Sequence, residues 1–120
     1  MIWAGWVAVC CEAVADLRLL DPESQRMQAG WLGGDPGSVP QRWDAASPVA
    51  RARDVRTPVL LLYAGGGTLA RQGQAWHRAL TAAGVPAELV MVPAADHVFS
   101  SVPAQQRLRR AVTGWSERHR

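Results

Sequence analysis

The sequence of 120 residues predicts an α/β fold built on parallel strands. Two short apolar runs, residues 58–64 and residues 87–92, have the length and composition of buried strands. Each is followed by a segment with helical spacing, residues 71–83 and residues 103–118. Strands that alternate with helices through short connections favour a parallel sheet with right-handed crossovers. We expect a further strand near residues 3–10 to join the same sheet.

The expected strands are continuous apolar runs bounded by turn residues. Residues 58–64 read PVLLLYA, with a proline at the first position and three glycines directly behind. Residues 87–92 read AELVMV and follow a Gly-Val-Pro turn. Runs that are apolar throughout, rather than alternating, are typical of strands buried on both faces. Residues 58–64 therefore predict a strand buried on both faces, and residues 87–92 predict a second strand.

The expected helices are recognised by apolar residues at i, i+3, i+4 and i+7. This spacing starts at Trp76 within residues 71–83 and at Leu108 within residues 103–118. Gly84 supplies a left-handed C-terminal position for the first helix, and a proline two residues later prevents its continuation. Both helices therefore have an apolar stripe that predicts packing against the sheet.

The segment between the first two strands is less regular. Residues 16–29 favour a short turn-prone or helical stretch, and residues 30–37 form a Gly/Pro-rich loop. Repeats and low-complexity tracts are absent from the sequence. The length accommodates a single small core. We therefore treat residues 1–120 as one partial or complete α/β domain.

Cys10 and Cys11 are adjacent at the end of the first apolar run. Neighbouring side chains of a strand point to opposite faces, so a disulfide between them would strain the backbone. We expect two buried free thiols. Free thiols are typical of a reducing compartment, which indicates a cytoplasmic location.

Charge and hydropathy exclude two classes of partner. The net charge is +3, but all thirteen basic residues are arginines and they are scattered along the chain. The local cluster Arg107, Arg109 and Arg110 falls on an expected solvated helix face, so we expect no nucleic-acid partner. The apolar runs all fall short of the roughly 18 residues that span a bilayer, so we expect no membrane partner.

Two features could carry chemistry. Residues 65–70 (GGGTLA) match a loose dinucleotide-binding pattern, but Glu88 stands near the start of the next strand, not at its end where the ribose-binding acid belongs. A plain strand-to-helix turn is the favoured interpretation, and we expect no cofactor. His97 follows the last strand, where an acid–base catalyst of an open α/β sheet would stand; the alternative is an ordinary surface histidine. Metal-ligand spacing is absent.

Several short motifs occur in an order that resembles a known family. They are residues 32–36 (LGGDP), 47–49 (SPV), 55–62 (VRTPVLLL), 74 (Q), 76–86 (WHRALTAAGVP) and 88–93 (ELVMVP), followed by His97 and Phe99. From about Trp6 to the C-terminus, the chain resembles the last third of the catalytic domain of prolyl oligopeptidase-family serine peptidases. The resemblance implies a partial α/β-hydrolase fold and hydrolysis of peptide substrates. It implies that His97 is similar to the histidine of the catalytic triad.

The sequence departs from the family pattern at two triad positions. Gly67 stands where the family has its carboxylate, in the stretch YAGGGTLARQGQ, and the serine-bearing G-x-S-x-G would lie before Met1. Asp96 adjoins His97, but neighbouring side chains on a loop rarely face each other, so we do not expect it to replace the acid. We therefore expect residues 1–120 to be inactive alone. The alternative is a non-catalytic α/β interaction module or pseudoenzyme, and an unpaired sheet edge would favour self-association.

Overall fold

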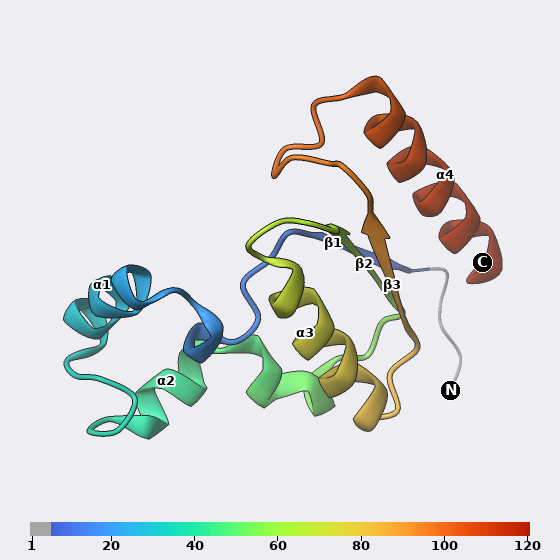
Figure 1. The fold of residues 1–120 in the computed structure, drawn as a ribbon. Helices are drawn as coiled ribbons and strands as arrows, with labels where there is room; N and C mark the ends of the chain where they lie inside the picture. The colour runs from blue at the N-terminus through green and yellow to red at the C-terminus, as the bar shows by residue number, and fades with distance from the viewer. Residues whose placement is uncertain (1–5) are drawn as a thin grey trace.

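The computed structural model describes residues 6–120, and its centre is an open sheet of three parallel strands in the order β1-β2-β3 (Figure 1). The strands are β1 (Ala8–Cys11), β2 (Val59–Ala64) and β3 (Ala87–Val92). Val59 is in register with Ala8 on one side and with Ala87 on the other. The predicted α/β fold with parallel strands is thereby confirmed.

The first strand is shorter than the predicted range of residues 3–10. Residues 3–5 of that range lie outside the described residues. Among the described residues, strand pairing begins at Ala8, whose amide donates to the carbonyl of Pro58 at 2.9 Å. The strand runs to Cys11. The strand begins here because its partner β2 begins at Val59, so residues 6 and 7 have no strand opposite them.

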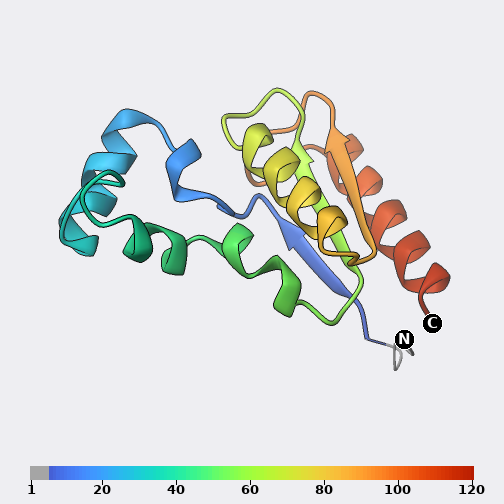
Figure 2. The same cartoon turned by 90° about the horizontal axis from the view of Figure 1, so that it is seen from below.

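The helices α3 (Ala70–Ala82) and α4 (Val102–Arg118) lie within one residue of the predicted ranges. They cover opposite faces of the sheet, so the body has three layers (Figure 2). Alternate residues of β2 supply the two cores: Leu61 packs on the α3 side with Leu80, and Leu62 packs on the α4 side with Trp115. No helix among residues 6–120 is both long and apolar enough to cross a membrane.

The segment between β1 and β2 forms a lobe that projects from the body (Figure 1). It contains α1 (Pro22–Leu32), α2 (Pro40–Ala46) and the 3-10 helices η1 (Leu17–Leu19) and η2 (Pro48–Asp54). The turn-prone or helical stretch predicted at residues 16–29 contains η1 and most of α1. Asp21 caps the start of α1, and the helix runs into the predicted loop as far as Leu32 before Gly33 turns it at φ 84°.

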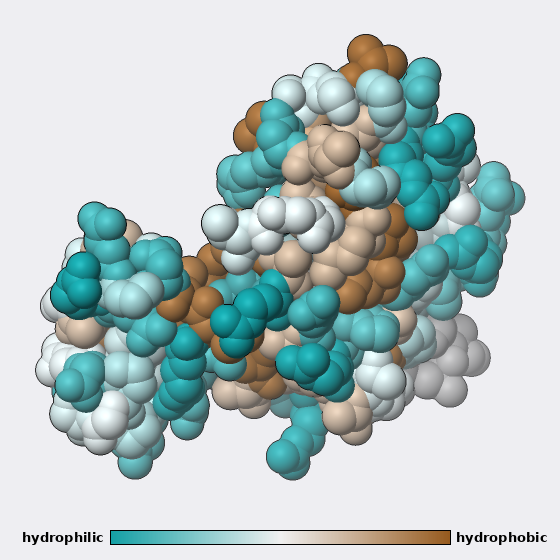
Figure 3. Space-filling model, in the orientation of Figure 1, coloured by the Kyte–Doolittle hydropathy of each residue, from teal (hydrophilic) through white to brown (hydrophobic). Residues whose placement is uncertain are grey.

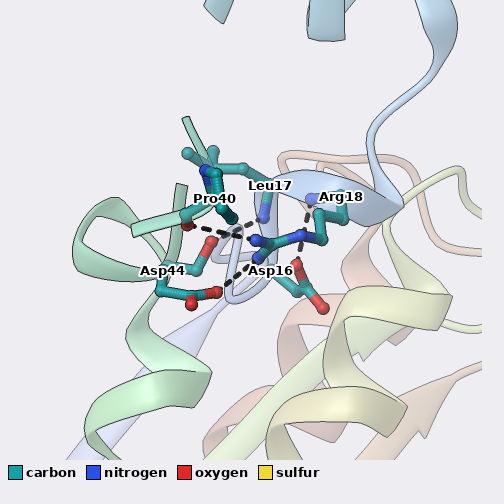
Figure 4. A network of polar contacts seen from close by, with 6 residues as sticks. Asp16, Leu17, Arg18, Pro40 and Asp44 are labelled. Atoms are coloured by element: carbon teal, nitrogen blue, oxygen red, sulfur yellow. Dashed lines mark hydrogen bonds and ion pairs between the residues drawn. The ribbon is translucent and has the colours of Figure 1, made fainter. Parts of the chain in front are cut away.

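Hydrophilic and neutral surface dominates this lobe in the space-filling view (Figure 3). A network of polar contacts joins η1 to α2 within the lobe (Figure 4). Arg18 donates to the carboxylate of Asp44 at 2.7 Å and to the carbonyl of Pro40 at 3.2 Å, while the Asp16 carboxylate accepts from the Arg18 amide at 2.9 Å. Because the Arg18–Asp44 pair is partly exposed, we expect it to orient the lobe more than to stabilise it.

The prediction of two buried thiols is wrong for Cys11. Both cysteines are free, but Cys10 is half-buried and Cys11 is exposed. The side chain of Cys10 packs on the α3 side of the sheet. By alternation Cys11 lies on the other face, where α4 packs on β2 and β3 and leaves the edge strand β1 open.

Candidate active site

His97 lies on the loop between β3 and α4, at the carboxyl edge of the sheet, and its side chain is 68% exposed. It lines a hollow of about 550 Å³ together with the turn that follows β2. The lining residues are Glu12, Gly66, Gly67, Thr68, Leu69, Ala94, Ala95, Asp96 and His97. The two loops that the sequence singles out therefore meet at one site, as expected for parallel strands that end at the same edge.

The carboxylate nearest to His97 comes from Glu12, directly after β1. Its Oε1 lies 3.8 Å from Nδ1 of His97, and its side chain is only 5% exposed. Oε1 also accepts the amide of Ala64 at 3.3 Å, while Oε2 is buried without a hydrogen-bond partner among the described residues. A buried carboxylate with an unused oxygen is costly, and it favours a nearby donor.

The end of β1 explains why this side chain turns inward. The Glu12 amide continues the ladder by donating to the carbonyl of Leu62 at 3.0 Å. In a parallel ladder the Glu12 carbonyl would next accept the amide of Ala64. Glu12 instead adopts a left-handed backbone, with φ 53°, and its carboxylate accepts that amide. The carboxylate is thereby held above the end of β2, beside His97.

Left-handed backbone is concentrated around this hollow. The non-glycine residues with positive φ in residues 6–120 are Glu12, Ala94 and Phe99. Glu12 and Ala94 line the hollow, and Phe99, two residues after His97, is buried in the core on the α4 side. Such conformations cost free energy and cluster at functional sites, so this distribution supports a functional role for the hollow.

The segment after Glu12 is pinned by buried polar side chains. The Gln72 side chain, which is 1% exposed, accepts the amides of Ala15 and Asp16 at 3.0 and 2.8 Å. The hydroxyl of Tyr63 donates to the carbonyl of Ala13 at 2.6 Å. Burial raises the pKa of Tyr63 well above its usual range, so this hydroxyl keeps its proton. These contacts fix the point at which the chain leaves β1.

Asp96, the neighbour of His97 in the sequence, makes its side-chain hydrogen bonds within the loop itself. Its carboxylate accepts the amide of Ser100 at 2.8 Å and also bonds the Ser100 hydroxyl. The Ser100 hydroxyl, followed by its amide, lowers the pKa of Asp96. This turn closes the loop that carries His97.

Other groups that could act as nucleophiles or ligands are a threonine in the hollow and the cysteines and histidines outside it. The hydroxyl that lines the hollow is that of Thr68. Burial, followed by the charges of Cys10 and Glu12, raises the pKa of Cys11, so its thiol is not activated. Of the remaining histidines, His77 lies within α3 and the ring of His119 packs against Trp115. Residues 6–120 contain no group of three metal-ligating side chains.

Sequence reasoning identified His97 and the Gly67 turn but missed Glu12. The available signal was an acidic residue directly after an apolar strand, where the carboxyl ends of all three strands meet. Without the pairing of β1 and β2, that residue is indistinguishable from an ordinary strand-end glutamate.

Comparison with protein families gives a match over almost the full sequence. The model of the prolyl oligopeptidase family matches residues 6–120, which is nearly the whole chain. The curated proteins contain no match to the sequence.

Proposed function

The chain belongs to the prolyl oligopeptidase family, and we propose that residues 1–120 are a partial catalytic domain in which His97 is the general base of peptide-bond hydrolysis. The observation that carries this proposal is the position of His97. It is exposed on the loop after β3, and it faces a hollow at the carboxyl edge of the sheet. Active sites of open α/β sheets lie at this edge.

The chemistry assigned to His97 is a pair of proton transfers. Its imidazole takes the proton of a serine hydroxyl as that oxygen attacks the peptide carbonyl, and it then gives the proton to the leaving amine. A G-x-S-x-G motif does not occur in residues 1–120, and the hollow is not lined by a serine. The nucleophile of this proposal is therefore supplied by polypeptide other than these residues, so residues 1–120 alone are inactive.

Complementation tests this assignment. The chain is co-expressed with the serine-bearing part of a catalytic domain from another member of the family, and hydrolysis of a prolyl chromogenic peptide is measured. The proposal expects activity that His97→Ala lowers by about 10⁴-fold or more. His77→Ala, which changes a histidine within α3, is the matched control and leaves the activity unchanged. Equal activity of wild type and His97→Ala in the complemented assembly would contradict the role of His97.

A second candidate function is a non-catalytic interaction module that associates through the outer edge of β1. Among the described residues β1 pairs only with β2. The amides of Ala8 and Glu12 point to β2, so by alternation those of Val9 and Cys11 point outward. Val9 is also 41% exposed. An unpaired edge with apolar side chains favours self-association, in the cytoplasm that the two free thiols suggest.

Sedimentation velocity at increasing protein concentration distinguishes this candidate. Self-association through β1 predicts a dimer that Val9→Lys weakens, because a charge on the edge opposes pairing with a second copy. Val98→Lys replaces a more exposed valine, at 73%, on the loop of His97 and leaves the dimer intact. A chain that stays monomeric at all concentrations would contradict self-association through β1.

A further inference from the structure

We infer that Glu12 is the positioning residue for His97. The carboxylate that orients the imidazole then comes from the end of β1, because the turn after β2 supplies none. This inference rests on the proposed function of His97 for its catalytic meaning, but the pairing itself is a separate, measurable property. It assigns a role to a residue on a strand end that the sequence pattern had left unassigned.

Distance and direction support the pairing. Nδ1 is the ring nitrogen of His97 that faces Glu12, at 3.8 Å from Oε1. This separation is within ion-pair range and slightly longer than a hydrogen bond, as is common for catalytic contacts in sites without substrate. With Nδ1 directed at Glu12, Nε2 is free to accept a proton from a hydroxyl nucleophile.

Gly67, in the turn after β2, and Glu12, at the end of β1, lie next to each other in the hollow. A Cβ built on Gly67, where the family has its carboxylate, would lie 3.8 Å from Oε1 of Glu12. The same Cβ would lie 3.2 Å from Cβ of Ala64 and 3.3 Å from its carbonyl oxygen, so the position has little room for a side chain. Glu12 Oε1 therefore lies next to the point from which a side chain on Gly67 would start, so both positions can place a carboxylate in the same part of the site.

Burial makes Glu12 suited to this task. The Glu12 side chain is only 5% exposed and is therefore held within the fold, whereas the His97 side chain that it faces is 68% exposed and stays accessible to a substrate. One of its oxygens lacks a partner among the described residues, which leaves it able to accept a further proton donor. The acceptor of a proton on Nδ1 holds the imidazole in the tautomer that has a free Nε2.

The imidazole tautomer tests the inference without any turnover. The ¹⁵N chemical shifts of His97 are measured in the full chain at a pH well above about 6.5, which is the ordinary pKa of a histidine side chain. The inference expects the Nδ1–H tautomer in the wild type. A wild-type spectrum that shows mainly the Nε2–H tautomer would overturn it, whatever the variants do.

Glu12→Gln separates positioning from a purely structural role. The amide keeps an oxygen that accepts the Ala64 amide, so the strand end is preserved. The same Oε1 position lies nearest to Nδ1, so the variant places a neutral amide oxygen where the carboxylate charge was. We expect a smaller share of the Nδ1–H tautomer and a larger share of the Nε2–H tautomer than in the wild type. Glu23→Gln, in the first turn of α1, is the matched control and leaves the His97 spectrum unchanged.

The outcomes also separate this inference from the proposed function. If His97 in a folded Glu12→Gln chain keeps the wild-type spectrum, Glu12 does not position it and the inference fails. If the tautomer shifts as expected while His97→Ala leaves complemented hydrolysis unchanged, the pairing stands and the catalytic role of His97 fails.

Discussion

The side chain of Gln72 forms hydrogen bonds with both backbone groups of Asp16. It accepts the Asp16 amide at 2.8 Å and donates to the Asp16 carbonyl at 2.9 Å. Gln72 lies in α3 and Asp16 follows β1, so the contact fixes the helix to the segment that leaves the sheet after Glu12. This reciprocal pair links the segment that follows Glu12 to the body of the fold.

We predict that Gln72→Ala destabilises the chain by about 2–4 kcal/mol, because it leaves the buried amide of Ala15 and both groups of Asp16 without their partner. Urea denaturation measures the change in the free energy of unfolding. Gln74→Ala changes an exposed residue of the same helix and is the control, with an expected effect within about 0.5 kcal/mol. Equal stability of the two variants would contradict the role of Gln72.

Close packing of α3 on the sheet gives a second prediction. A Cβ added at Gly73 would lie 2.6 Å from Cδ2 of Tyr63, inside the contact distance of two carbon atoms. Gly73→Ala should therefore destabilise the chain by about 1–3 kcal/mol, although alanine favours a helix. Thermal or urea unfolding provides the measurement.

Gly114→Ala is the matched control for that variant. Gly114 also lies within a helix, α4, but its added Cβ meets only the flexible end of Arg118, at 3.1 Å. We expect this variant to be stabilised by about 0.5–1 kcal/mol through helix propensity. A stabilised Gly73→Ala chain would show that α3 does not pack on Tyr63 as described.

The fold of the body could be predicted from the sequence because its signals are strong and local. The run at β2 is apolar throughout and buried throughout, and α3 follows with a clear apolar stripe. The lobe was predicted poorly for the opposite reason. Its longest helix, α1, contains no buried residue, so its position depends on the cap at Asp21 and on the turn at Gly33 rather than on periodicity.

The candidate site was predictable only in part. His97 could be predicted because it directly follows a recognisable strand. Glu12 could not, because its role depends on the register of β1 against β2 and on a left-handed backbone that the sequence does not signal. The pairing of a strand end with a distant loop is a property of the assembled sheet.

Acidification should release the loop that carries His97. Hydrogen bonds from Ser100 lower the pKa of Asp96, so the folded chain binds a proton there less readily than the unfolded chain does. The resulting stabilisation is complete above the unfolded value of about 3.9 and is lost as the pH falls through the lower folded value. We predict that the Ser100 amide resonance titrates with a midpoint below about 3.9.

Two variants check that assignment. Asp96→Asn should abolish the titration of the Ser100 amide, because the side chain no longer changes charge. Asp35→Asn removes a similar carboxylate whose pKa Ser38 lowers in the lobe, and it should leave Ser100 unaffected. A Ser100 midpoint above the ordinary aspartate value would contradict the prediction.

The last prediction concerns activity: purified residues 1–120 alone should not hydrolyse prolyl or acyl-aminoacyl chromogenic substrates above background. Loss of one triad member costs on the order of 10⁴-fold in turnover, and the hollow has neither a serine nucleophile nor the amide of its elbow. Even with Glu12 beside it, His97 would activate only water. The measurement compares wild type with His97→Ala at equal concentration. Clear turnover that disappears in the variant would contradict the prediction and would direct attention to Thr68, whose hydroxyl lines the same hollow.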